Sequence, residues 1–157
     1  MVTDLLGALL IELSKAMKIP ELHPDSNNSC MIRLKSGLII QMEMDHSGQF
    51  LILGADLGTV PPGKYRENLF KEALKANDNP YPLNGILSFS RKSGHLVLFE
   101  KMYIKDLTGE KIADQVNPFA EKAFLWSEAL LHNDIPLINQ SSSTQLSGKG
   151  GIFGLIK

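Results

Sequence analysis

The stretch that most constrains the fold is the middle of the chain, residues 57–78, LGTVPPGKYRENLFKEALKAND. Its proline-rich turn precedes a short amphipathic helix, predicted over residues 65–77, whose apolar stripe is Leu69, Phe70, Ala73 and Leu74. Apolar segments of strand length lie on both sides of this helix. No catalytic or metal-binding motif occurs in the stretch or beside it. The pattern therefore predicts a binding surface made from a sheet and a few helices.

Three strands are predicted before this helix, over residues 30–34, 38–44 and 49–57. Tight turns with the sequences KSG and HSG join them, so we expect an antiparallel meander. Alternation assigns one face to the apolar residues Cys30, Ile32, Leu34, Leu38, Ile40, Met42 and Met44. The opposite face should be polar if it met only water.

That second face is instead partly apolar. It contains Met31 and Ile39, and the third strand is apolar on both sides, with Leu51, Leu53 and Ala55 against Phe50 and Ile52. We therefore expect a cover over part of this face. The protein's own helices or tail, a second subunit and a ligand peptide are the alternatives.

The remaining elements complete an α+β pattern. A first helix is predicted over residues 3–18, a hairpin of strands over 85–90 and 95–103, and a last helical region over 108–132 that is kinked or restarted at Asn117-Pro118. The predicted order is α-βββ-α-ββ-α, an α+β domain with one antiparallel sheet and three helices. We predict one domain over residues 1–138 and a flexible C-terminal tail over residues 139–157.

Composition excludes several classes of protein. The net charge is −1 and no basic stripe is present, so there is no electrostatic case for nucleic acid binding. The single cysteine, Cys30, excludes an internal disulfide framework and fits a reducing compartment. No apolar run approaches the roughly 18 residues that a membrane helix needs, and the first residues lack a signal-peptide pattern. We therefore expect a cytoplasmic protein without membrane insertion.

The candidates for chemistry are few. Cys30 is a possible nucleophile, with His23, His46, His95 and His132 as candidate bases, and a small thiol enzyme is one alternative function. The other interpretation of Cys30 is a small buried residue in a strand. The histidines have no metal-ligand spacing, and the glycine and lysine cluster at residues 148–151 lacks the full phosphate-loop pattern. We therefore predict no enzyme activity, no metal and no cofactor.

Several short motifs, taken in order, resemble the class I type III secretion chaperones, the Tir chaperone or SycE-like family. The resemblance covers residues 5–136 and looks most like the versions found in chlamydia-like intracellular bacteria. The motifs are NNSCMIR at 27–33, QME at 41–43, LGTVPPGKYRENLFKEALKAN at 57–77, GILSFS at 85–90, GEK at 109–111, and the helix pattern Phe119, Ala123, Trp126 and Leu130.

The resemblance implies a bacterial cytoplasmic homodimer that holds the non-globular N-terminal segment of a secreted effector before a secretion ATPase exports it. A heterodimer with another chaperone stays open, as does a chaperone-fold regulator that binds a transcription or secretion component. The family's dimer contact maps to Leu69, Phe70, Ala73, Leu74, Ile86 and Ser88. Its cargo patches map to Leu5, Leu10, Met31, Ile39, Phe50 and Ile52.

The apolar end of the chain suggests a further hypothesis. Ile152, Phe153 and Leu155 follow a stretch rich in serine and glycine. They are candidates for a self-ligand that covers the empty cargo patch.

Overall fold

The computed structural model describes residues 3–79 and 83–137. It confirms the predicted order α-βββ-α-ββ-α. The elements are α1 Thr3–Met17, β1 Ser29–Arg33, β2 Ile39–Met44, β3 Phe50–Thr59, α2 Lys64–Asn77, β4 Ile86–Ser90, β5 His95–Tyr103 and α3 Gly109–Leu131. The predicted tail, its self-ligand residues and the cluster at residues 148–151 lie outside the described residues.

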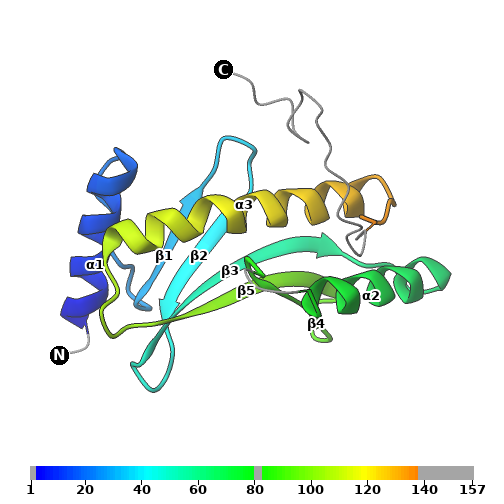
Figure 1. Ribbon diagram of the computed structural model, residues 1–157, viewed down its shortest axis with the longest axis horizontal. Helices are drawn as coiled ribbons and strands as arrows, with labels where there is room; N and C mark the ends of the chain where they lie inside the picture. Colours follow the sequence, from blue (N-terminus) through cyan, green and yellow to red (C-terminus); the bar gives the residue numbers. More distant parts are fainter. Residues whose placement is uncertain (1–2, 80–82, 138–157) are drawn as a thin grey trace.

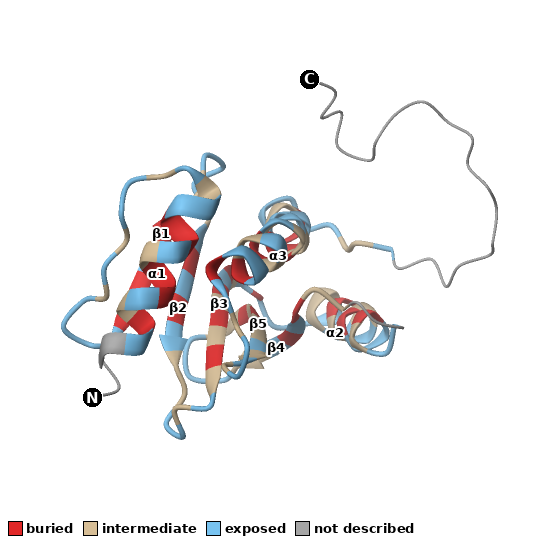
Figure 2. Cartoon of the chain, turned by 60° about the vertical axis from the view of Figure 1, so that its left-hand side comes forward, coloured by how far each residue is buried: buried red, intermediate tan, exposed pale blue. Residues whose placement is uncertain are grey.

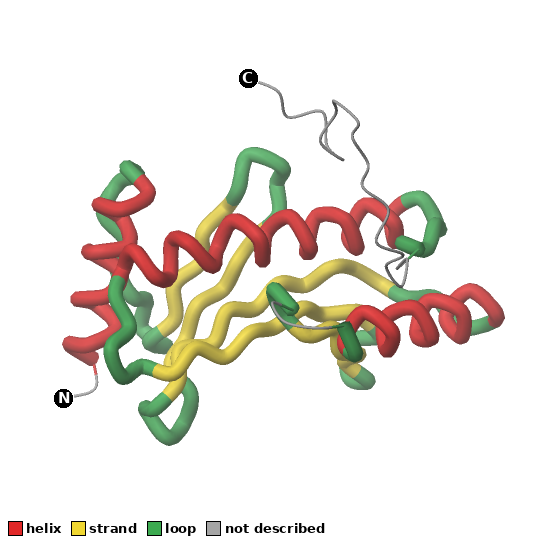
Figure 3. The backbone as a smooth tube through the Cα atoms, viewed as in Figure 1, coloured by secondary structure: helices red, strands yellow, loops and turns green. Residues whose placement is uncertain are grey.

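The strands form one antiparallel sheet in the order β1-β2-β3-β5-β4 (Figure 1). The helix α3 runs across this sheet, α1 lies beside α3 at the β1 end, and α2 lies at the β4 end (Figure 3). Inward-facing strand residues and residues of all three helices share one core. The helices therefore lie on one face of the sheet, and no helix among the described residues covers the other face, which we call the outer face.

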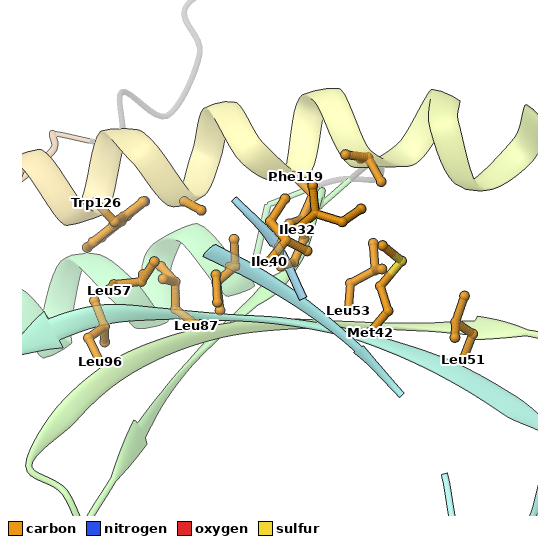
Figure 4. Packing of buried hydrophobic residues seen from close by; sticks show 14 of the residues in the cluster. Ile32, Ile40, Met42, Leu51, Leu53, Leu57, Leu87, Leu96, Phe119 and Trp126 are labelled. Carbon is orange, nitrogen blue, oxygen red and sulfur yellow. The ribbon is translucent and has the colours of Figure 1, made fainter. Parts of the chain in front are cut away.

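Alternation along the strands accounts for this core. Ile32, Ile40, Met42, Leu51 and Leu53 point toward α3, where Phe119 and Trp126 meet them (Figure 4). Both aromatic side chains are buried, with 1% exposure or less. Each carries a large apolar area into the core, which makes α3 the main cover of the sheet.

The contact between α1 and α3 depends on a glycine. A Cβ on Gly109 would lie 2.4 Å from the backbone of Glu12 and Leu13, so only glycine lets the two helices approach this closely. The Gly109 amide also donates to the Glu12 carboxylate at 3.0 Å. A second cap comes from Thr108, whose hydroxyl accepts a hydrogen bond from the Lys111 amide at 3.2 Å. Acceptors at a helix N-terminus satisfy otherwise unpaired amides.

Of the two alternatives predicted at Asn117-Pro118, the restart is wrong, because α3 is continuous from Gly109 to Leu131. The kink stays a prediction. Proline removes one backbone hydrogen bond, to the carbonyl of Asp114. Asp114 is exposed, so its carbonyl lies on the water-facing side of the helix. The loss is therefore tolerated.

Ser14 is a polar residue of α1 that lies in the interior. It is 2% exposed. Its hydroxyl donates to the Leu10 carbonyl at 2.7 Å and accepts from the Leu22 amide at 2.8 Å. A buried hydroxyl with both bonds made costs little. Here it fastens the loop after α1 to the helix.

Candidate functional site

The outer face carries a row of five residues, one from each strand. The register places Met31, Gln41, Gly54, Phe99 and Ile86 side by side. Met31 is 62% exposed and Ile86 39%. Gly54 lies at the centre of the row, and a Cβ built there would meet nothing within 4 Å. A glycine in a strand interior often marks a place where another chain approaches closely.

A neighbouring part of the outer face is aromatic. Phe50 and Tyr103 are cross-strand partners whose ring centroids are 5.5 Å apart. The Lys101 ammonium lies 4.4 Å from the centre of the Phe50 ring. Ile52, the partner of Lys101 in the register, is half-buried like Phe50. Buried and more exposed positions alternate along β3 (Figure 2). Among the described residues, the apolar outer side of β3 is thus shielded by its sheet neighbours alone.

The structure brings four of the six predicted cargo residues together. Met31, Ile39, Phe50 and Ile52 all lie on the outer face. Leu5 is 43% exposed but lies on α1, which packs on the helical face. Leu10 is 1% exposed and belongs to the core. Its predicted role at the surface is therefore wrong for this conformation, because α3 and the sheet cover it.

Sequence reasoning missed three outer-face residues, Gly54, Val97 and Phe99. Val97 and Phe99 point outward from β5 beside Asp56 and Gly54. The continuous apolar run from Leu96 to Phe99 was the available signal, because it supplies apolar side chains to both faces of the strand. Leu96 and Leu98 are buried, whereas Val97 and Phe99 are only partly covered.

A second apolar surface lies between α2 and β4. It is made of Phe70, Leu74, Ile86 and Ser88, and we call it the α2–β4 surface. Leu74 is 68% exposed, and a hollow of about 220 Å³ separates α2 from β4. Leu69 and Ala73, predicted for the same contact, are 0% and 7% exposed. These two residues anchor α2 to the sheet and are not free to contact a partner.

Two side chains shape the edge of this surface. Asn77 donates to the Leu87 carbonyl and accepts from the Leu87 amide, both at 2.9 Å. These bonds replace a partner strand at that point of the edge strand β4. Lys122 of α3 donates to the carbonyls of Leu83 and Gly85, at 2.8 and 2.7 Å, and so fixes the start of β4. A partner of this surface would therefore pack side chains against α2 instead of pairing with Leu87.

A half-buried polar cluster connects α3 to β5. Glu100 accepts hydrogen bonds from the Gln115 amide at 2.9 and 3.0 Å. Burial raises the pKa of Glu100, while Gln115 and the charge of Lys122 act in the opposite direction. Burial lowers the pKa of Lys122, and Glu100 opposes this. The charged forms of both groups therefore cost stability in the folded state.

Substitution of Glu100 by glutamine is expected to change how stability depends on pH. The folded-state pKa lies above the ordinary value of 4.5, so the native chain loses stability as the pH rises from that value through the folded-state pKa. Glutamine keeps an acceptor for Gln115 and does not ionise. We expect urea unfolding of Glu100→Gln to lack this decline between acidic and neutral pH. A parallel decline in both proteins would contradict the assignment.

The thiol chemistry considered from the sequence finds no support in the geometry. Burial, followed by the charge of Asp25, raises the pKa of the Cys30 thiol, which disfavours the nucleophilic thiolate. His95 bonds to Asp56 at 2.7 Å, and His23 and His132 lie 3.5 Å from neighbouring glutamates. Among the described residues, no three potential ligands are grouped to hold a metal ion. No helix of that part of the chain is long and apolar enough to cross a membrane.

Solved structures show the same fold. A chain of the HopA1–SchA chaperone–effector complex matches with a TM-score of 0.66 and 18% identity, covering 81% of this chain and 96% of that one. The Yersinia pestis type III secretion chaperone SycH, in complex with a stable fragment of YscM2, gives 0.59 and 14%, covering 77% and 98%. The ExoT–SpcS complex from Pseudomonas aeruginosa gives 0.59 and 16%, covering 77% and 96%.

No curated protein matches the sequence. The model of the Tir chaperone protein (CesT) family, however, matches residues 8–127, which extend from within α1 nearly to the end of α3. This range contains the whole sheet and both apolar surfaces described above. The chain belongs to the Tir chaperone protein family.

Proposed function

We propose that this protein is a type III secretion chaperone that binds the non-globular N-terminal region of a secreted effector and keeps it competent for export. Family membership supports this, as do the structural neighbours, among them a chaperone–effector complex and a type III secretion chaperone bound to a protein fragment. Such a protein works in the bacterial cytoplasm, and its activity is binding without catalysis.

The single observation that carries the proposal is the uncovered apolar outer face. All three helices pack on the opposite face, so Met31, Ile39, Phe50 and Ile52 are left for another polypeptide. An extended segment binds such a surface by placing apolar side chains in its hollows and pairing its backbone with free strand edges. The strand row centred on Gly54 offers a shallow floor for such a segment.

The energies fit reversible binding. Four apolar anchors at about 1.5–3 kcal/mol each give roughly 6–12 kcal/mol before costs. Ordering the bound segment takes back about 2–5 kcal/mol or more. The remaining affinity is modest for one surface, and two copies of the surface on a dimer raise it through effective concentration. An export machine that unfolds its substrates can reverse binding of this strength.

Purification from the native host tests the proposal. The tagged chaperone, expressed at its normal level, is expected to recover a secreted protein, and limited proteolysis of the complex should leave only that protein's N-terminal region bound. Mass spectrometry identifies both. Recovery of a transcription component in place of a secreted protein would overturn the effector-binding role and favour a regulator.

We also propose that the α2–β4 surface joins two copies of the chain. Leu74 and Ile86 are exposed in a single chain, although large apolar side chains at the surface of a monomer are usually scattered. Leu74 and Ser88 line the hollow of about 220 Å³, which lets a symmetric copy insert its own Leu74 there. A heterodimer with a related chaperone would use the same residues.

The double substitution Leu74→Asp and Ile86→Asp is expected to convert the dimer into monomers, because buried unpaired carboxylates at an interface are costly. Sedimentation velocity measures the outcome. Leu131→Asp with Leu125→Asp is the matched control, because Leu131 is 72% and Leu125 37% exposed, against 68% for Leu74 and 39% for Ile86. Equal dissociation of both double variants, or of neither, would contradict the proposed interface.

A further inference from the structure

A groove opens where β2 turns away from β3. The two strands pair only from Gln41–Met44 to Leu51–Gly54, so residues 55–59 of β3 have no partner on that side within the described chain. Figure 1 shows β1 and β2 diverging from β3 at this point. The groove has a volume of about 790 Å³ and reaches from Ile39 and Met31 on the outer face to Phe124 on α3.

The wall of this groove is apolar, and its charge is acidic. Asp56 and Glu128 line it together with His95, and no lysine or arginine is among the described lining residues. Asp56 bonds to His95, and Glu128 lies 3.5 Å from His132. Asp56 also accepts a hydrogen bond from the Gly58 amide at 3.0 Å. No lysine or arginine among the described lining residues offsets the two carboxylates. An apolar segment with a positive charge therefore complements the groove.

The chain itself contains such a segment. Residues 138–157 include Lys149 and Lys157 but no acidic residue, and they end with the apolar block IFGLI followed by Lys157. An apolar block of this size can supply a short strand and two or three side chains to an open strand edge.

The end of α3 lies beside the groove, and the last described residues, Ile135 and Leu137, line a hollow against α2. The segment after α3 is fastened beside α2, where the Tyr65 hydroxyl donates to the Asp134 carbonyl at 2.9 Å. The end of α3 lines the groove through Ser127 and Glu128, and Leu130 approaches the Cβ position of Gly58 to 3.9 Å. The end of β3 and the end of α3 thus meet beside the groove, and the chain continues from Leu137 next to α2.

The sequence between Leu137 and Ile152 is long enough for the apolar block to reach the groove. Ile152 follows Leu137 by 15 residues (152 − 137), and the intervening sequence is rich in serine and glycine. Sequences of this kind and length span about 21 Å root-mean-square from end to end. A compact domain of about 140 residues has a radius of gyration of roughly 14 Å, so most of one side of it is within reach. A tethered segment of this length is present at an effective concentration in the millimolar range.

We propose that residues 152–157 of the same chain occupy this groove when no cargo is bound, with the apolar block along the open edge of β3 and Lys157 near Asp56 and Glu128. The contact does not require the proposed chaperone function. If that function holds, the segment competes with cargo at Ile39 and Met31, which line the groove and belong to the outer face. The tail then acts as an internal ligand that weakens cargo binding and shields the apolar surface.

Hydrogen exchange of the full-length protein tests the contact without any cargo. In the triple variant Ile152→Ser, Phe153→Ser and Leu155→Ser, the amide hydrogens of residues 55–59 should exchange about tenfold faster than in the wild type. The reason is that a strand paired with the open edge protects amides there. Leu146→Ser, in the same segment but outside the apolar block, is the matched control and should leave exchange unchanged. Equal exchange in the wild type and the triple variant would overturn the proposal.

A photo-crosslinking amino acid in place of Phe153 locates the occupant. Benzoylphenylalanine keeps the aromatic ring, and cross-links are expected to peptides that contain Ile39, residues 54–58 or Phe124. In a mixture of isotope-labelled and unlabelled protein, the linked peptides should come from the same chain. Cross-links elsewhere on the surface, or only between different chains, would overturn the assignment.

A charge reversal tests the acidic rim. Glu128→Lys should reduce these cross-links several-fold, because it places like charges together. Glu121→Lys makes the same change at an exposed position of α3 outside the groove, and should have no effect. Equal cross-linking in the two variants would contradict the role of charge. Because none of these measurements uses cargo, failure of the tail contact is distinguishable from failure of the chaperone function.

Discussion

Replacing Gly109 with alanine is expected to lower the free energy of unfolding by about 3 kcal/mol or more, beyond most single overpacking substitutions. The new methyl group would lie 2.4 Å from the carbonyl carbon of Glu12 and the amide nitrogen of Leu13. These are backbone atoms inside α1, so they cannot rotate away as a side chain would. The two helices must separate, and the hydrogen bond from the Gly109 amide to Glu12 is then lost.

Urea denaturation followed by circular dichroism measures this effect. A loss of 3 kcal/mol corresponds to roughly 6–12 °C in melting temperature for a chain of this size. Gly54→Ala is the matched control, because a Cβ at Gly54 meets nothing within 4 Å. We expect the control to stay within about 0.5 kcal/mol of the wild type. If both glycine variants are equally stable, the close approach of α1 and α3 is not what selects glycine at position 109.

Replacing both Phe50 and Ile52 with aspartate is expected to abolish capture of the effector recovered from the native host. The change removes two apolar anchors of about 1.5–3 kcal/mol each, which corresponds to a roughly 10²–10⁴-fold increase in the dissociation constant. Binding would also strip water from two new carboxylates. The chain itself should tolerate the change, because both side chains are only half-buried and lie beside the Lys101 ammonium.

Isothermal titration calorimetry with the N-terminal region of that effector gives the affinity, and sedimentation gives the oligomeric state. Asn28→Asp with Asn117→Asp adds the same negative charge at two exposed positions away from the outer face, and should bind normally. If the Phe50 and Ile52 variant binds the effector's N-terminal region as tightly as the wild type does, the outer face is not the binding site. The same sedimentation run would show whether the double variant has lost its fold. In that case, single substitutions at Phe50 and at Ile52 would test whether each residue contributes to effector binding.

The two proposed roles, cargo binding and dimerisation, fall on different surfaces of the chain. The predicted cargo residues of the outer face lie on β1, β2 and β3, whereas the α2–β4 surface lies at the far edge of the sheet (Figure 1). A partner subunit on the α2–β4 surface can therefore leave the centre of the outer face open. Phe99 and Ile86 connect the two along the strand row, so cargo on one subunit can extend toward the next.

Much of the fold was predictable because its signals are local. Alternation in β1 and β2 assigned Ile32, Ile40 and Met42 to the core, and all three are buried. Turn chemistry predicted the antiparallel pairing of consecutive strands, β1 with β2, β2 with β3 and β4 with β5. The uncovered apolar residues Met31 and Ile39 were also visible in the alternation. They are exposed because no helix packs on that side.

What periodicity left open is which side of each helix meets a neighbour. Leu5 and Leu10 lie on the same broad apolar face of α1, yet only Leu10 is buried, because the position of α3 decides which part of that face is covered. Leu69 and Leu74 differ in the same way on α2. Ser14 is buried because the loop after α1 returns to it, a contact between residues eight positions apart.

The sequence by itself determined the order of elements, the turns between consecutive strands and the apolar character of both sheet faces, since these depend on neighbours along the chain. The tertiary structure alone decided that all three helices share one face, that Gly109 must be glycine, and that Gly54 centres a row across five strands. Each of these depends on contacts between segments far apart in the sequence. Backbone packing distances and cross-strand neighbours are set only when those segments meet.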